Sequence, residues 1–246
     1  MTYFTRFPVN VTRRQSRSML ANPYLIHATL AASFPLSGQA ASSGSRILWR
    51  LDRQAGGSTL LYVVSPEKPS LVGLDEQIGF PDLEPQWVTR EYEPFLNRIE
   101  NGQKYHFRLV ANPVVKKRPV EGGARKLIPH LTLLQQAAWL AGKAAYIGTG
   151  VEVPEHFARE EVSRAERHGF RICHNEPNGE ISLVVSNSNK QSFKKTSGDT
   201  VTMATAQYDG LLEVANADKL RSALVGGIGR AKSFGCGLLT LVPYGG

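Results

Sequence analysis

The sequence predicts an α+β fold built from two similar halves in tandem. Three observations predict it: short stretches of alternating apolar residues, helices with recognisable caps, and the order of these elements along the chain. In the first half, a strand, a helix, two strands and a further strand are expected at residues 3–11, 22–35, 46–52, 59–64 and 104–111. In the second half, a helix, two short strands, a long strand, a helix and a last strand are expected at 131–144, 170–174, 181–185, 200–214, 216–224 and 238–242. Both orders suit a ferredoxin-like unit, so we expect two tandem ferredoxin-like (RRM-like) domains.

A basic stretch between the two halves predicts the domain boundary. Residues 116–129 hold five Lys and Arg residues together with Pro and Gly, a composition typical of linkers. We therefore place the first domain at 1–115, a basic linker at 116–129 and the second domain at 130–246. The linker is either a solvated tether or a segment that contacts nucleic acid.

The first predicted helix carries the candidate catalytic residues. Asn22 is the expected cap, Pro23 occupies the first turn, and Pro35 ends the helix. Tyr24 and His27 are three residues apart and therefore lie on one face. Because histidine titrates near neutral pH, this pair is suited to proton transfer on a phosphodiester. The same spacing also suits a structural His–Tyr pair without a catalytic role.

Arginines precede this helix. Residues 12–18 place Arg13, Arg14 and Arg17 beside small hydroxyl side chains. We expect a loop here that either grips phosphate groups or is simply a solvated cationic segment.

A second basic segment lies between the strands of the second half. Lys190, Lys194 and Lys195 precede the long strand at 200–214, which predicts a basic hairpin. Cations along a β-ribbon bind the phosphates of a nucleic-acid stem. A solvated lysine-rich turn is the alternative.

The C-terminal stretch 226–237 holds five glycines, two cations and a serine between a predicted helix and a predicted strand. Backbone N–H groups in glycine-rich turns form anion-binding concavities, which indicates a phosphate site. Its candidate phosphate-binding residues are Gly227, Gly229, Arg230, Lys232 and Ser233. A nucleotide-binding P-loop is excluded because that motif follows a strand and opens a helix, the reverse of the order here. A glycine-rich connection that binds nothing remains the alternative.

Composition restricts the class of partner. Lys and Arg number 29 against 21 Asp and Glu, giving a formal net charge of +8, which suits a polyanion. The two cysteines are too few for a disulfide framework, no apolar run approaches a membrane span, and no signal-peptide core begins the chain. We expect a cytoplasmic protein without a membrane segment or a cofactor. The six histidines form no HExxH or paired CxxC arrangement, so no metal site is expected.

Four stretches in the same order resemble the CasE family, the CRISPR-repeat endoribonuclease of type I-E systems. The most specific is the glycine-rich loop at 227–239; the others are 24–27 with 34–35, 107–113 and 136–140. The resemblance spans nearly the whole chain and implies two tandem ferredoxin-like domains.

The resemblance also implies a function. It implies a nuclease that binds the hairpin of each CRISPR repeat and cuts at the 3′ base of the stem without metal, by attack of a 2′-hydroxyl. The products carry a 2′,3′-cyclic phosphate and a 5′-hydroxyl. The family's catalytic histidine falls on His27 and its tyrosine on Tyr24, and which of them is the base stays open. The mature crRNA would stay bound, with other Cascade subunits as partners. A non-catalytic RNA stem-loop-binding subunit is the alternative.

Two departures from the family pattern affect the site. Residues 145–168 are longer than the turn that the family has there. Some members carry a lysine about one turn after the catalytic histidine, where this chain has Ala31 and Ala32. The three arginines at 13, 14 and 17 are candidates for the missing cation.

Overall fold

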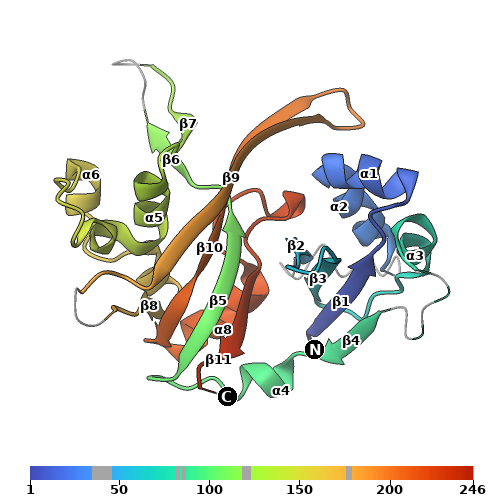
Figure 1. The fold of residues 1–246 in the computed structure, drawn as a ribbon, viewed down its shortest axis with the longest axis horizontal. Coiled ribbons are helices and arrows are strands. Elements are labelled where there is room, and N and C mark those ends of the chain that lie inside the picture. The colour runs from blue at the N-terminus through green and yellow to red at the C-terminus, as the bar shows by residue number, and fades with distance from the viewer. Residues whose placement is uncertain are drawn as a thin grey trace.

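The computed structural model describes residues 1–34, 46–80, 82, 84, 87–117, 123–175 and 179–245. Figure 1 shows two domains side by side, each built on its own sheet. The first domain contains β1 (Tyr3–Val9), α1 (Arg14–Ala21), α2 (Pro23–Ala32), β2 (Leu48–Arg53), β3 (Thr59–Ser65), α3 (Val72–Ile78) and β4 (Val88–Glu91). Its antiparallel sheet has the order β2-β3-β1-β4. The first and third strands therefore lie in the centre, which is the ferredoxin-like order.

The short helix α4 (Glu93–Leu96) leads into the second domain. Its elements are β5 (Lys104–Ala111), β6 (Val114–Lys117), β7 (Lys126–Pro129), α5 (Leu133–Ala141), η1 (Gly142–Tyr146), α6 (Glu155–Ala158), α7 (Arg164–Arg167), β8 (Phe170–Ile172), β9 (Leu183–Lys194), β10 (Thr200–Val214), α8 (Ala217–Gly226), η2 (Lys232–Phe234) and β11 (Leu239–Pro243). The sheet has the order β11-β5-β10-β8, and β9 pairs with the rest of β10. Again the first and third long strands are central. The predicted α+β fold with two tandem ferredoxin-like domains is confirmed.

The predicted domain boundary is wrong. The strand at 104–111 was assigned to the first domain, but β5 pairs with β10 and β11 in the second sheet. The first sheet is completed instead by β4, a strand of only four residues. The alternating pattern of β5 fits either sheet equally well, because alternation specifies a buried face and not a partner strand.

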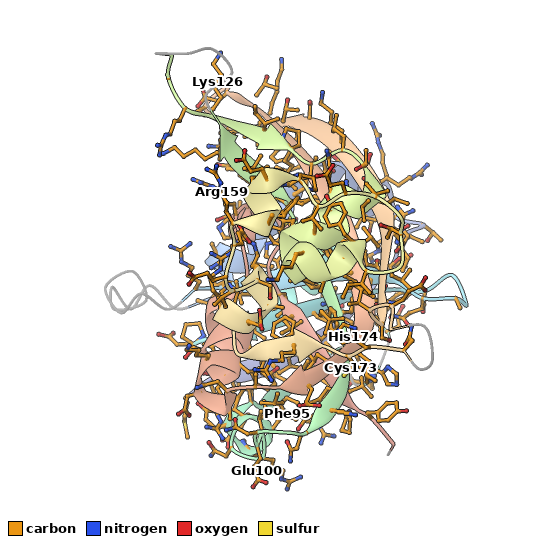
Figure 2. The ribbon with its side chains drawn as sticks, turned by 90° about the vertical axis from the view of Figure 1, so that its left-hand side faces the viewer. Phe95, Glu100, Lys126, Arg159, Cys173 and His174 are labelled. Atoms are coloured by element: carbon orange, nitrogen blue, oxygen red, sulfur yellow. The ribbon has the colours of Figure 1, made fainter. Side chains whose placement is uncertain are left out.

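The predicted linker is also corrected. Most of its described residues form the strands β6 and β7, which pair as an antiparallel hairpin between β5 and α5. Residues 118–122 of the predicted linker lie outside the described part of the chain. Figure 2 shows Lys126 where this hairpin projects from the body of the second domain. The hairpin is thus an insertion within the second domain and does not connect the two domains.

The predicted arginine loop at 12–18 is largely a helix. Helix α1 starts at Arg14, and its Ser16 and Met19, three residues apart, are both buried. Met19 belongs to the first domain's core, so burial of one face outweighs the weak helix preference of the serines in this stretch.

The two domains are held together by a buried arginine. Arg50 on β2 is 2% exposed, and its guanidinium donates to both carboxylate oxygens of Asp52 at 2.7 and 2.8 Å. It also donates across the interface to the carbonyl oxygens of Arg108 and Leu238, both at 2.9 Å, and to the Thr240 hydroxyl at 2.8 Å. Because these bonds need both domains at once, Arg50 fixes how the first sheet meets β5 and β11.

Candidate functional site

The local sequence places the start of α2 as predicted. The Asn22 side chain accepts a hydrogen bond from the Tyr24 backbone N–H at 3.1 Å, and Pro23 is the first helical residue. The predicted stop at Pro35 lies outside the described residues. Ile26 and Leu30 are buried in the first domain's core. Tyr24 and His27 lie off that face and are half-buried.

His27 has an unusual environment. Its Nδ1 atom is buried and has no hydrogen-bond partner among the described residues. Burial lowers the pKa of the imidazole below its ordinary value of 6.5, because desolvation disfavours the charged form. A neutral imidazole near pH 7 can accept a proton, which is the property required of a general base.

Tyr24 is contacted by the basic hairpin of the second domain. Figure 1 shows the paired ribbon of β9 and β10 reaching from the second domain toward α1 and α2. At its tip the Thr196 hydroxyl donates to the Tyr24 phenol oxygen at 3.2 Å. The Asn22 amide donates to the Lys194 carbonyl oxygen at 3.1 Å. The predicted hairpin therefore exists, and its tip lies at the beginning of α2.

The glycine-rich loop reaches the same place. Phe193, Met203 and Cys236 form a small buried cluster, against which Tyr24 and Phe234 pack. Phe193 on β9 and Phe234 on η2 meet edge to face, with ring centroids 5.0 Å apart. Three segments that are distant in sequence thus converge on Tyr24: the start of α2, the hairpin and the glycine-rich loop.

The glycines of this loop are required by close packing. Gly227, Gly229 and Gly235 all have positive φ angles, between 73 and 84°. A Cβ atom at Gly235 would lie 2.8 Å from the Trp49 ring, and one at Gly229 would lie 3.0 Å from the Trp139 ring. The close approach that predicted a phosphate site is made, at these positions, to aromatic side chains of the protein.

The two predicted cations of the loop do not form one site. Arg230 is exposed and lines a cavity of about 310 Å³ with Lys116 and His130. Lys232 lines a different, shallow cavity with Arg167 and His168, and its ammonium donates to the Gly226 carbonyl oxygen at 2.7 Å. Burial lowers the pKa of Lys232, and the nearby Arg46 lowers it further. The side chain of Lys232 therefore satisfies a carbonyl at the end of α8.

The remaining predicted cations differ in whether they are exposed or already bonded to the protein. The Arg13 guanidinium donates to the Glu76 carbonyl oxygen at 2.6 Å, at the end of α3. Arg14 and Arg17 are exposed on α1, which packs beside α2. The other exposed candidates are Lys190 and Lys194 on β9 and Ser233 on η2, while Lys195 is half-buried at the turn.

Comparison with known proteins shows the family to which this chain belongs. A family model described as "CRISPR associated protein" matches residues 2–243. The chain belongs to this family of CRISPR-associated proteins. Cse3 of Thermus thermophilus, named a CRISPR-associated endoribonuclease, is 27% identical over 245 residues, which cover 98% of this chain and 100% of the relative.

Two solved structures carry the same fold. Thermus thermophilus Cse3, bound to an RNA that represents a pre-cleavage complex, is 25% identical with a TM-score of 0.69, covering 98% of this chain and 99% of that one. A chain of a CRISPR RNA-guided surveillance complex in a pre-nicking state is 20% identical with a TM-score of 0.59, covering 98% of this chain and 100% of that one. The resemblance to the CasE family is confirmed.

The segment at 145–168 supports the loop from outside. The Arg164 guanidinium lies 4.3 Å from the Trp139 ring centroid and donates to the Trp139 carbonyl oxygen at 3.2 Å. Trp139 in turn packs beneath Gly229. Helix α7 therefore holds the tryptophan on which the glycine-rich loop rests.

Sequence reasoning missed Thr196 and Phe193 as parts of the site. Threonine and phenylalanine do not by themselves indicate a catalytic or binding role. The one signal that could have identified them is their place near the tip of a basic hairpin.

Among the described residues, no group of three His, Cys, Asp or Glu side chains is placed to hold a metal ion. Cys173 and His174 lie together after β8, in the face of the second domain that Figure 2 presents. Within the described part of the chain, no helix is both long and apolar enough to cross a membrane.

Proposed function

We propose that this chain is a metal-independent CRISPR endoribonuclease that cleaves the repeat stem-loop of precursor crRNA at the 3′ base of the stem. One observation carries the proposal: Tyr24 and His27 share a face of α2 at the point where the basic hairpin and the glycine-rich loop meet that helix. The 27% identical relative, named a CRISPR-associated endoribonuclease, supports the same reaction. The likeness to a chain of the surveillance complex supports retention of the product in Cascade with other subunits.

The surface charge supports RNA as the substrate. Arg14 and Arg17 are exposed on α1, which packs beside α2, and Lys190 and Lys194 are exposed on the hairpin whose tip meets the start of α2. A-form stems are recognised through phosphates and shape, so a ribbon of cations is the appropriate surface. The glycine-rich loop adds the exposed Arg230 and Ser233.

The chemistry assigns one role to each catalytic residue. His27 accepts the proton of the 2′-hydroxyl, whose oxygen forms a new bond to the adjacent phosphorus while the bond from phosphorus to the 5′ oxygen breaks. Because Nδ1 of His27 is buried, Nε2 is the nitrogen for this transfer. The Tyr24 hydroxyl donates a hydrogen bond at the phosphate, and the departing 5′ oxygen takes a proton from water. The products are a 2′,3′-cyclic phosphate and a 5′-hydroxyl.

We assign to the hairpin of this chain the cation that some family members carry on the catalytic helix. Ala31 and Ala32 occupy the family's lysine position. Arg13 is engaged with the end of α3, so it is a poor candidate. Lys195 directly precedes Thr196, whose hydroxyl donates to Tyr24, so it is the hairpin cation nearest in sequence to that contact.

The test is cleavage of a hairpin RNA copied from the CRISPR repeat of the host genome. We expect His27→Ala to slow cleavage about 10²–10⁴-fold while RNA affinity is unchanged, since acid–base catalysis contributes that factor. His106→Ala is the matched control, because His106 is exposed on β5 and away from α2. Cleavage should persist in EDTA and leave a cyclic phosphate. Tight binding by the wild-type protein without any cleavage would instead identify a non-catalytic stem-loop-binding subunit.

A further inference from the structure

The tip of the β9–β10 hairpin is bonded to the start of α2 at two points. The Asn22 amide donates to the Lys194 carbonyl oxygen, and the Thr196 hydroxyl donates to the Tyr24 phenol oxygen at 3.2 Å. Asn22 is also the cap of α2, so the same residue that starts the helix anchors the hairpin. The hairpin tip is therefore part of the surroundings of Tyr24.

The turn that carries Thr196 has bonds of its own. The Lys195 backbone N–H donates to the Asp199 carbonyl oxygen at 2.9 Å, and the Ser197 hydroxyl donates to the Asp199 carboxylate at 2.8 Å. Behind the turn, Phe193 is buried and packs against Phe234 of the glycine-rich loop. These contacts hold the Thr196 hydroxyl at a defined place relative to α2.

We propose that Thr196 is a positioning residue for the cleavage reaction, acting through Tyr24; this inference rests on the proposed function. A phenol oxygen accepts hydrogen bonds through its lone pairs and donates one through its O–H. When Thr196 fills an acceptor position, the phenol O–H of Tyr24 is left to point toward the RNA phosphate. Without Thr196, water competes for the phenol and its O–H is no longer held in one direction.

This arrangement couples RNA binding to the placement of a catalytic group. Lys190 and Lys194 belong to the same hairpin as Thr196, and both are exposed. An RNA stem bound along these lysines therefore contacts the same hairpin that orients Tyr24. The hairpin both binds the substrate and positions Tyr24.

The experiment is a double-mutant cycle measured by single-turnover cleavage of the repeat hairpin RNA at saturating protein. Thr196→Val removes the hydroxyl and keeps the shape, while Thr196→Ser keeps the hydroxyl. Each is made in the wild-type protein and in Tyr24→Phe. Thr202→Val is the matched control, because it makes the same change on the same hairpin at a hydroxyl that bonds Ser192 and not Tyr24. RNA affinity is measured in parallel by filter binding.

We expect Thr196→Val to slow cleavage about 3- to 10-fold, the usual effect of one neutral hydrogen bond, with Thr196→Ser close to wild type. In Tyr24→Phe, Thr196→Val should cause no further loss, and RNA affinity should not change. An equal loss in both backgrounds, an unchanged rate, or a loss of affinity alone would overturn the inference while leaving the nuclease assignment intact. Wild-type protein that binds the hairpin without cutting it would overturn both.

Discussion

Replacing the buried arginine at the domain interface tests whether one side chain holds the two domains in register. In Arg50→Met the side chain keeps much of its apolar length but loses its donors. The carbonyl oxygens of Arg108 and Leu238 then lose the hydrogen bonds that Arg50 donates, and Asp52, which is 6% exposed, loses its bidentate partner. Arg108 still lies 3.6 Å from the Asp52 carboxylate, which limits the damage.

The magnitude follows from these contacts. Breaking a buried ion pair by removing one partner costs about 3–5 kcal/mol, because a charge is left buried without its counter-ion. We expect the lower half of that range, about 3–4 kcal/mol, since Asp52 keeps Arg108 nearby. Urea unfolding followed by tryptophan fluorescence measures the loss. The matched control is Arg53→Met on the same strand, where the arginine is exposed and the expected change is about 0.5 kcal/mol or less.

The same variant should impair cleavage of the repeat hairpin. His27 lies in the first domain, whereas the hairpin and the glycine-rich loop belong to the second. Loosening the interface is expected to move them apart, while the first domain keeps the core cluster that consists of its own residues alone. A free energy of unfolding within about 1 kcal/mol of wild type would refute the view that Arg50 sets the domain orientation.

Three further predictions follow. Gly235→Ala should destabilise the protein by about 2–5 kcal/mol in urea unfolding, because it combines a positive φ with a clash against Trp49. The control Gly150→Ala, which has a positive φ but open space around the new methyl group, should cost about 1–2 kcal/mol. Equal losses in the two variants would contradict this prediction. Burial lowers the pKa of His27 and His168, so the unfolded chain binds more protons below about pH 6.5. The contribution of these two histidines to stability should be present above that pH and be lost on acidification. A melting temperature that is the same at pH 7.5 and at about pH 5.5 would argue against it. RNA affinity should fall steeply with salt because each neutralised phosphate releases a counter-ion, and titrations at 50 and 200 mM salt with equal affinity would exclude phosphate-dominated binding.

The sequence predicted those elements whose signals are local. Asn22 and Pro23 mark the start of α2, and Asn216 marks the start of α8, where its side chain accepts from the Lys219 backbone N–H. Strand alternation located β1, β5 and most of β10. Each of these patterns depends on a few adjacent residues, so it can be recognised without the rest of the chain.

Long-range contacts decided the rest. Alternation alone could not assign β5 to the second sheet, because a strand's pattern does not encode its partner. The glycine-rich loop was predicted to approach a phosphate, but two tryptophans from distant segments occupy the space beside Gly229 and Gly235. Arg14 and Arg17 were expected in a loop, and packing of Met19 makes the stretch a helix.

The candidate site depends both on local sequence signals and on long-range contacts. Tyr24 and His27 were placed on one face by helical spacing alone, and nothing in that spacing shows what faces them. Only the folded chain brings Thr196, Phe193 and the glycine-rich loop to Tyr24 and leaves Nδ1 of His27 without a hydrogen-bond partner among the described residues. The chemical identity of a side chain is thus determined by the sequence. Its neighbours, and through them its protonation and orientation, are determined by which distant segments pack around it, since desolvation and hydrogen bonding act through space and not along the chain.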